Sequence, residues 1–211
     1  MDIPSREPYS FGFTAGGLGL SYCQTLAGLY VELGDWADVR GRALESNALR
    51  QGRRASSIRV EREFRQRVQT LSEDQIRLLA EGNSAEARPL ALLAVFKRYS
   101  VIFDFCVLTL LPKLNVFDSE LRPSDLDNFF AEVEPAHPEI AEMTDSTLAK
   151  VRQVMIRILA EGGILSDTER PAIAPLPLLP EVARVISDDS PDLLRGFLLD
   201  DHSLAACAPL L

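Results

Sequence analysis

The chain has 211 residues, with 22 Lys and Arg against 31 Asp and Glu, a formal net charge of −9 and 46% hydrophobic residues. This length and composition predict a soluble globular protein, and they exclude a disordered tail or a polytopic membrane protein. The overall acidity also argues against a protein that coats nucleic acid with its whole surface.

An uncharged stretch covers residues 8–31 and has enough length to span a bilayer. Its many glycine and hydroxyl residues argue against a membrane span, and no positively charged region precedes it as in a secretory signal. We therefore expect a buried helix over residues 20–33 that stops at Gly34, in a cytoplasmic protein without a membrane partner.

Helical periodicity continues through the first half of the chain. Asp35 is typical of a cap for a second helix that runs to residue 46. Ser56 or Ser57 is expected to cap a third helix that reaches residue 70. Helical spacing gives this third helix a buried stripe, flanked by Arg65 and Arg67, that consists of Val60, Phe64, Val68 and Leu71.

The most apolar part of the chain lies at residues 90–111. A capping box of Ser72 and Gln75 predicts a short helix before it, and Ser84 can cap the apolar helix itself. Only Lys97, Ser100 and Asp104 form a polar strip along it. This pattern predicts a central helix surrounded by others, which Pro112 ends or kinks.

The last hundred residues predict shorter helices. We expect a helix over residues 124–134, a helix capped by Thr144 that stops at Gly162 and Gly163, and helices near residues 180–187 and 192–200. Residues 164–174 have the pattern of a very small β wing. The predicted class is all-α, a compact bundle around a central apolar helix. We expect a helical domain at 1–170, and a proline-rich linker and C-terminal helices at 171–211 that pack on it.

Charge is distributed unevenly along the chain. Residues 40–67 hold nine arginines against three acidic residues, whereas residues 114–211 hold eighteen acidic against seven basic residues. Arginine suits phosphate, so the leading candidate nucleic-acid contacts are Arg50, Arg53, Arg54, Arg59 and Arg62. The alternative is a solvated face that pairs with the acidic half.

A second candidate surface is the helix capped by Thr144. With the glycines and possible wing behind it, this helix resembles the recognition helix of a winged helix-turn-helix, with Lys150, Arg152 and Arg157 as contacts. An ordinary amphipathic bundle helix is the alternative, favoured by the acidity of its neighbourhood.

No pattern indicates an enzyme, a cofactor or a metal. Phosphate-binding, nucleophile-elbow and zinc motifs are absent from the sequence. Cys23, Cys106 and Cys207 are too far apart for a metal motif, and His137 has the sequence context of a loop or cap residue. Two pairs of acids are expected to be structural rather than ligands of a divalent ion: Asp125 with Asp127, and Asp188 with Asp189.

Short blocks of residues follow one another in a familiar order: Asp35-Trp36, Glu45-Ser46-Asn47, Arg53-Arg54-Ala55-Ser56-Ser57, Glu63-Phe64-Arg65-Gln66-Arg67-Val68 with Leu71, Lys97-Arg98-Tyr99 with Asp104-Phe105, Ser146-Thr147 with Lys150-Val151, and Leu159-Ala160-Glu161-Gly162-Gly163-Ile164-Leu165. These blocks, within residues 9–165, resemble the BrxA family of BREX, the bacterial bacteriophage-exclusion defence systems. The resemblance implies a helical fold like that of the antitermination protein NusB, binding of double-stranded DNA, and contacts with other BREX subunits.

Two functions remain open at this point. The first is a non-enzymatic DNA-binding accessory protein of a BREX system. The second is an interaction subunit without a nucleic-acid role, in which the leucine-rich residues 175–211 dock on a partner rather than close the protein's own core. The sequence specifies no oligomeric state.

Overall fold

Helices make up nearly all the regular structure of residues 7–200, 202 and 204, which are the residues that the computed structural model describes. The α-helices are α1 (Leu20–Leu33), α2 (Trp36–Glu45), α3 (Arg54–Val68), α4 (Glu73–Glu81), α5 (Ser84–Arg98), α6 (Ser100–Phe105), α7 (Leu111–Asn115), α8 (Pro123–Val133), α9 (Asp145–Gly162) and α10 (Pro180–Ser187). The 3₁₀ segments are η1 (Gly12–Ala15), η3 (Glu134–Ala136), η4 (Pro138–Ile140) and η5 (Pro191–Phe197), and η2 (Cys106–Leu110) is a π-helix. The predicted all-α class is confirmed.

Most helix ends lie where short-range capping predicts them. The Asp35 carboxylate accepts the main-chain N–H groups of Ala37 and Asp38, and Ser72 forms its capping box with Gln75. Gly34 ends α1 with a φ of 72°. Because these signals depend only on residues within one turn of a helix, the sequence contains all the information that they need.

The start of α3 corrects the prediction. The helix begins at Arg54, with Arg53 at the N-cap position and without a side-chain cap, rather than at Ser56 or Ser57. The main-chain N–H of Ser57 donates to the carbonyl of Arg53, so the serine already lies in the first turn. Two arginines therefore occupy the end of the helix that a serine was expected to hold.

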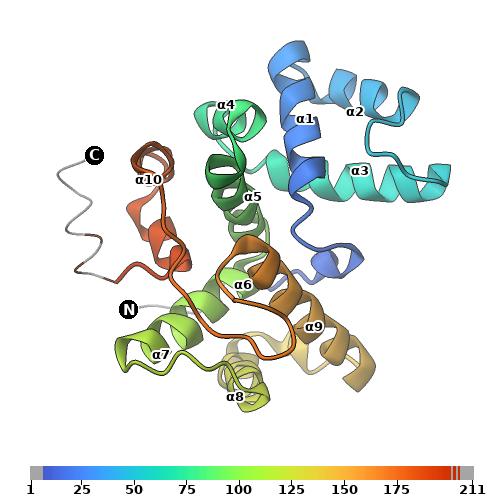
Figure 1. Ribbon diagram of the computed structural model, residues 1–211. Helices are drawn as coiled ribbons and strands as arrows, with labels where there is room; N and C mark the ends of the chain where they lie inside the picture. Colours follow the sequence, from blue (N-terminus) through green and yellow to red (C-terminus); the bar gives the residue numbers. More distant parts are fainter. Residues whose placement is uncertain (1–6, 201, 203, 205–211) are drawn as a thin grey trace.

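The long apolar helix is central, but it is broken. Residues 90–96 of α5 are all buried, and α5 contacts α1, α3, α4, α9 and α10 around it (Figure 1). The chain leaves helical geometry at Tyr99, with φ −135° and ψ 79°. The Tyr99 hydroxyl donates to Oε1 of Glu63 on α3 at 2.5 Å, and its ring packs edge-on to Phe13 at 5.2 Å. These tertiary contacts replace the helix turn that a continuous apolar pattern predicts.

The predicted polar strip is also divided by this break. Asp104 is buried and accepts a hydrogen bond from the Tyr9 hydroxyl at 2.7 Å. Lys97 instead reaches Asp189, with 2.6 Å between Nζ and Oδ2. Each of these two charged groups thus finds a partner on another segment, as buried polar groups require.

The C-terminal part that the structure describes packs on the rest of the molecule. Helix α10 contacts α4 and α5, and η5 contacts η2. Leu194, Phe197 and Leu198 are buried there. These residues close the protein's own core and are not available for docking a partner.

The predicted wing forms no strand within the described residues. Leu165 pairs with Ile173, and Ala172 pairs with Glu120, each as an isolated antiparallel bridge. The segment before α8 thus joins the turn that follows α9.

The uncharged residues 8–31 form η1, the glycine-rich turn and α1 (Figure 1). Phe13, Leu18, Cys23 and Leu26 from this stretch are buried in the core. Among the described residues, no helix combines the length and the apolar character needed to cross a membrane.

Candidate nucleic-acid interface

Five predicted contacts of the basic region project into solvent from one connection and one helix. Arg50 lies in the turn between α2 and α3, Arg53 and Arg54 lie at the start of α3, and Arg59 and Arg62 follow along it. All five are exposed, and none forms an ion pair within the part of the chain that the structure describes. Their charges are therefore available to a ligand.

Asn47 shapes the connection that carries Arg50. Its side-chain amide donates to the carbonyl of Gln51 at 3.1 Å, and its Oδ1 accepts the N–H of Gln51 at 3.0 Å. Asn47 and Arg50 both have positive φ, 49° and 50°. This conformation is uncommon for an arginine, and the side-chain hydrogen bonds of Asn47 compensate for it.

Arg53 and Arg54 place two positive charges at the positive end of the α3 helix dipole. The N-terminus of a helix carries partial positive charge, so each cation there costs about 0.3–1 kcal/mol. The first turn of α3 contains no acidic residue that would offset this cost. An anionic ligand at this end would interact favourably with both the helix and the guanidinium groups.

Two arginines of the same region are structural. Arg67 is fully buried: Nε lies 2.8 Å from Oε1 of Glu63, Nη1 donates to the carbonyl of Gly17 at 2.8 Å, and the guanidinium lies over the Phe64 ring. The sequence predicts Arg67 at the edge of the apolar stripe, and the structure shows that this edge is buried as well. Arg67 comes seven residues after Val60 and three after Phe64, so helical spacing places it on the buried face.

Arg65 likewise pairs with a buried partner. Its Nε lies 2.6 Å from Oε1 of Glu61, whose side chain is 1% exposed. Of the nine arginines, Arg65 and Arg67 are therefore committed to the fold.

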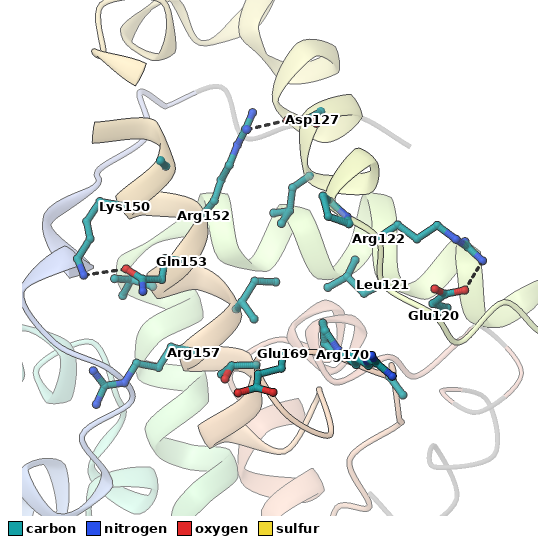
Figure 2. A pocket seen from close by; sticks show the side chains of 18 of the residues that line it. Glu120, Leu121, Arg122, Asp127, Lys150, Arg152, Gln153, Arg157, Glu169 and Arg170 are labelled. Carbon is teal, nitrogen blue, oxygen red and sulfur yellow. Dashed lines mark hydrogen bonds and ion pairs between the residues drawn. The ribbon is translucent and has the colours of Figure 1, made fainter. Parts of the chain in front are cut away.

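The second predicted surface lines a hollow of about 1030 Å³ between α8, α9 and residues 168–172 (Figure 2). Its basic side chains are Arg122, Lys150, Arg152, Arg157 and Arg170. Lys150 donates to Gln153, whereas Arg152 is paired with Asp127 at 2.7 Å. In this hollow Lys150, which bonds to a neutral side chain, therefore lies near Arg152, which Asp127 already neutralises.

A second hollow, of about 720 Å³, brings the two predicted surfaces together. Arg59 from α3, Arg88 from α5 and Arg157 from α9 all line it. Arg157 also lines the larger hollow, so the two are adjacent. Figure 1 shows α3 and α9 on the same side of the molecule, with η1 between them. Arg59 and Lys150 therefore line adjacent hollows that share Arg157. The other four arginines of the basic region, Arg50, Arg53, Arg54 and Arg62, lie outside both hollows.

The sequence gives no indication that Arg88 and Arg170 belong to this surface. Each is a single basic residue without a run of basic residues around it. Arg88 is exposed and, among the described residues, has no ion pair. Only the packing of α5 against α9 places Arg88 at the same hollow as Arg157, so no local signal identifies it.

Candidate metal ligands are paired with cations instead. Asp125 lies 3.1 Å from Nζ of Lys113, and Asp188 lies 2.9 Å from Arg184. Within the described residues, no three His, Cys, Asp or Glu side chains are grouped to hold a metal ion.

The two described cysteines are buried within the protein. Burial raises the pKa of the Cys23 thiol to about 12 and raises the pKa of Cys106 as well. Both are therefore neutral thiols at neutral pH, a poor state for a nucleophile. Cys207 lies outside the described residues.

His137 lies in a loop, as predicted, and is fully buried there. Its ring stacks on Tyr9 with 3.5 Å between centroids, and Nδ1 lies 3.1 Å from Oε1 of Glu139. This contact fixes the N-terminal segment to the turn before α9.

Comparison with known proteins gives the family. The sequence profile of the BrxA family matches residues 7–190. The chain belongs to the BrxA family. Three curated "BREX protein BrxA" sequences are similar to it, from Escherichia coli O9:H4 (strain HS), Bacillus cereus (strain H3081.97) and Paramagnetospirillum magneticum (strain ATCC 700264 / AMB-1).

The similarity to these BrxA proteins is distant. The E. coli protein is 28% identical over 123 residues, 58% of either chain. The B. cereus protein is 23% identical over 62% of this chain and 65% of its own length. The P. magneticum protein is 25% identical over 77% of this chain and 82% of its own length.

A solved structure shares the fold. The crystal structure of an uncharacterized protein from Magnetospirillum magneticum superposes with a TM-score of 0.78 at 21% identity, and it covers 91% of this chain and 98% of the other. At this identity the match bears on the fold alone.

Proposed function

We propose that the chain is a non-enzymatic component of a BREX phage-defence system and binds double-stranded DNA through its arginine-bearing side. The observation that carries this proposal is that Arg59 and Arg157 line the same hollow. Arg53, Arg54 and Arg59 on α3 and Lys150 on α9, which have no ion pair among the described residues, could then contact phosphates of one duplex.

The placement of Arg53 and Arg54 supports the proposal. Cations at a helix N-terminus are a local cost to folding, so their presence there favours a role in binding. The acidic half of the chain does not neutralise them, because none of the five exposed arginines has an ion pair in the described residues.

The test is duplex binding, followed by fluorescence anisotropy as salt is raised from about 50 to about 200 mM. About six phosphate contacts would weaken binding by about 10³-fold or more over this range. The variant Arg53→Glu/Arg54→Glu/Arg59→Glu and the variant Lys150→Glu/Arg157→Glu should each reduce both the affinity and the salt slope.

A matched control reverses two exposed arginines elsewhere. Arg77 and Arg184 line a different hollow together with Asp74, Glu81, Glu86 and Glu181. Arg77→Glu/Arg184→Glu should leave binding unchanged. Equal loss in the control and the test variants would contradict the proposed surface, and a duplex RNA of the same sequence separates DNA from RNA binding.

A second function, docking of other BREX subunits, is favoured by the turn after α7. Phe117 is 96% exposed and has a φ of 60°, and Val116 is 72% exposed. Phe is enriched at protein interfaces, and strained backbone is found mainly at functional segments.

Ion pairs hold this turn in place. Lys113 Nζ lies 2.7 Å from Asp118 and 3.1 Å from Asp125, and Arg122 lies 2.9 Å from Asp118. Hydrogen bonds from Lys113 and Arg122 lower the pKa of Asp118 to about 2. Phe117→Ser should therefore abolish co-purification with co-expressed BREX subunits and leave DNA affinity unchanged, whereas Val31→Ser, an exposed change on α1, should affect neither.

A further inference from the structure

The carboxylate of Glu161 on α9 is held against the glycine-rich segment, residues 16–19. Its Oε2 accepts the main-chain N–H of Leu18 at 2.6 Å, and its Oε1 accepts a hydrogen bond from Nε of Arg157 at 2.7 Å. Gly17 permits this approach, because a Cβ there would overlap Oε2 of Glu161. The segment thus presents a main-chain donor to an anion, and the protein's own carboxylate occupies it.

The surroundings of this carboxylate are strongly positive. The hollow of about 720 Å³ is lined by Arg59, Arg88 and Arg157, from three different helices, and Glu161 is the acidic residue among its lining side chains. Arg59 and Arg88 are exposed and, in the described part of the chain, have no ion pair. Three guanidinium groups and one carboxylate therefore line the same hollow, and Arg157 is the one that contacts Glu161.

The remaining lining is suited to a ligand larger than a simple anion. Tyr22, Gln24 and Gln51 line the same hollow, and the Tyr22 hydroxyl accepts a hydrogen bond from Nε2 of Gln51 at 3.1 Å. An aromatic ring and two side-chain amides beside arginines are groups that contact bases and sugars. The volume lies within the range of pockets that hold small organic ligands.

We propose that this hollow is a binding site for the phosphate group of a nucleotide unit. A phosphate oxygen takes the place of the Glu161 carboxylate at the N–H of Leu18, and Arg59, Arg88 and Arg157 contact the other phosphate oxygens. Arginine forks and main-chain N–H groups in a concave segment are recurrent phosphate ligands. Glu161 then acts as a competing anion that weakens binding at this site.

The phosphate has two possible sources, a nucleic-acid chain or a free nucleotide. If it belongs to DNA, the inference rests on the proposed function and assigns one phosphate of the duplex to this hollow. If it belongs to a free nucleotide, the site is independent of DNA binding. The chemistry at Leu18 is the same in both cases.

The test is a titration of the ¹⁵N-labelled full chain followed by the amide signals of Gly17 and Leu18. The probes are AMP and a short duplex DNA. Glu161→Gln keeps the side-chain shape and an acceptor for Leu18 but removes the competing charge, so it should tighten binding by about tenfold. Arg88→Gln should weaken binding by a similar factor, and Arg77→Gln, on α4 and at a different hollow, should change nothing.

Each outcome distinguishes the site from the proposed function. A Leu18 signal that responds to the duplex or to AMP, with the Glu161→Gln and Arg88→Gln effects, supports the site and identifies the source. Duplex binding, with Gly17 and Leu18 signals that respond neither to the duplex nor to AMP, overturns the site while the proposed function stands. A response to AMP in a chain that does not bind duplex overturns the proposed function and supports the site.

Discussion

Arg67 and Glu63 form an ion pair inside the protein, with 2.8 Å between Nε and Oε1 and an arginine side chain that is fully buried. Glu63 also accepts the hydroxyl of Tyr99 at 2.5 Å, so the pair links α3 to the break in the central helix. Charges removed from water are tolerated only when both partners stay in place.

Replacement of Arg67 by Met should lower the free energy of unfolding by about 3–5 kcal/mol, because it leaves a mostly buried carboxylate without its cation. Urea unfolding measures this difference. Arg62→Met, on the exposed side of the same helix, is the control and should stay within about 0.5 kcal/mol of the parent. A similar small effect for both variants would contradict the structural role of Arg67.

Reversal of the charge at the start of α3 should stabilise the protein while it weakens DNA binding. Arg54→Glu replaces a cation by an anion at the positive end of the helix dipole, which is worth about 0.6–2 kcal/mol at low salt. Unfolding free energies measure this gain, and Arg62→Glu, in mid-helix, should show none. Unchanged or lower stability in Arg54→Glu would show that the helix dipole does not govern this position.

Two buried tyrosines make stability sensitive to alkaline pH. Burial, followed by the hydrogen bond to Asp104, raises the pKa of Tyr9, and burial with the hydrogen bond to Glu63 raises the pKa of Tyr99, both above the ordinary value of 10.0. A raised pKa in the folded state means that the stabilisation is complete below pH 10.0 and is lost as the pH rises above it.

The double variant Tyr9→Phe/Tyr99→Phe should therefore be less stable at neutral pH but lose less stability on alkaline titration. Unfolding free energies measured at about pH 8 and about pH 11 give the slope. If the parent and the double variant have equal slopes, the two tyrosines do not titrate with folding.

Two glycines of the N-terminal region should respond in opposite directions to alanine. Gly19 has a φ of 64°, and a Cβ there would overlap the Phe64 ring. Gly19→Ala should cost about 2–5 kcal/mol from backbone strain and overpacking. Gly28, within α1, has open space where an alanine Cβ would lie, with no contact within 4 Å, so Gly28→Ala should stabilise by about 0.5–1 kcal/mol. Thermal unfolding of the two variants checks both signs.

Features that depend on neighbours along the chain could be predicted from the sequence. The caps at Asp35, Ser72 and Thr144 and the stop at Gly34 lie within one turn of the groups that they satisfy, so the residues alone determine them. The buried side of α9 follows from helical spacing in the same way, since Val151, Met155, Ile158 and Leu159 recur at intervals of three and four residues or lie next to such a position.

Other features depend on contacts between distant segments, and the sequence did not reveal them. The break at Tyr99 is stabilised by the hydrogen bond from its hydroxyl to Glu63, which is 36 residues away in the chain. The hollow at Arg59 and Arg157 needs the glycine-rich segment to lie between α3 and α9. A helical wheel shows the direction of a side chain but not which partner it meets. The sequence therefore does not identify Arg88 and Arg170 as residues that line the two hollows.

The break at Tyr99 also bears on how the proposed DNA surface would bind. Because Tyr99 joins α3 to the centre of the molecule through Glu63 and through the guanidinium of Arg67, 5.6 Å from its ring, the arginine-bearing helix is braced before any ligand arrives. A braced surface loses little conformational entropy on association. The affinity of such a surface would then depend mainly on charge and solvent, with little contribution from coupled folding.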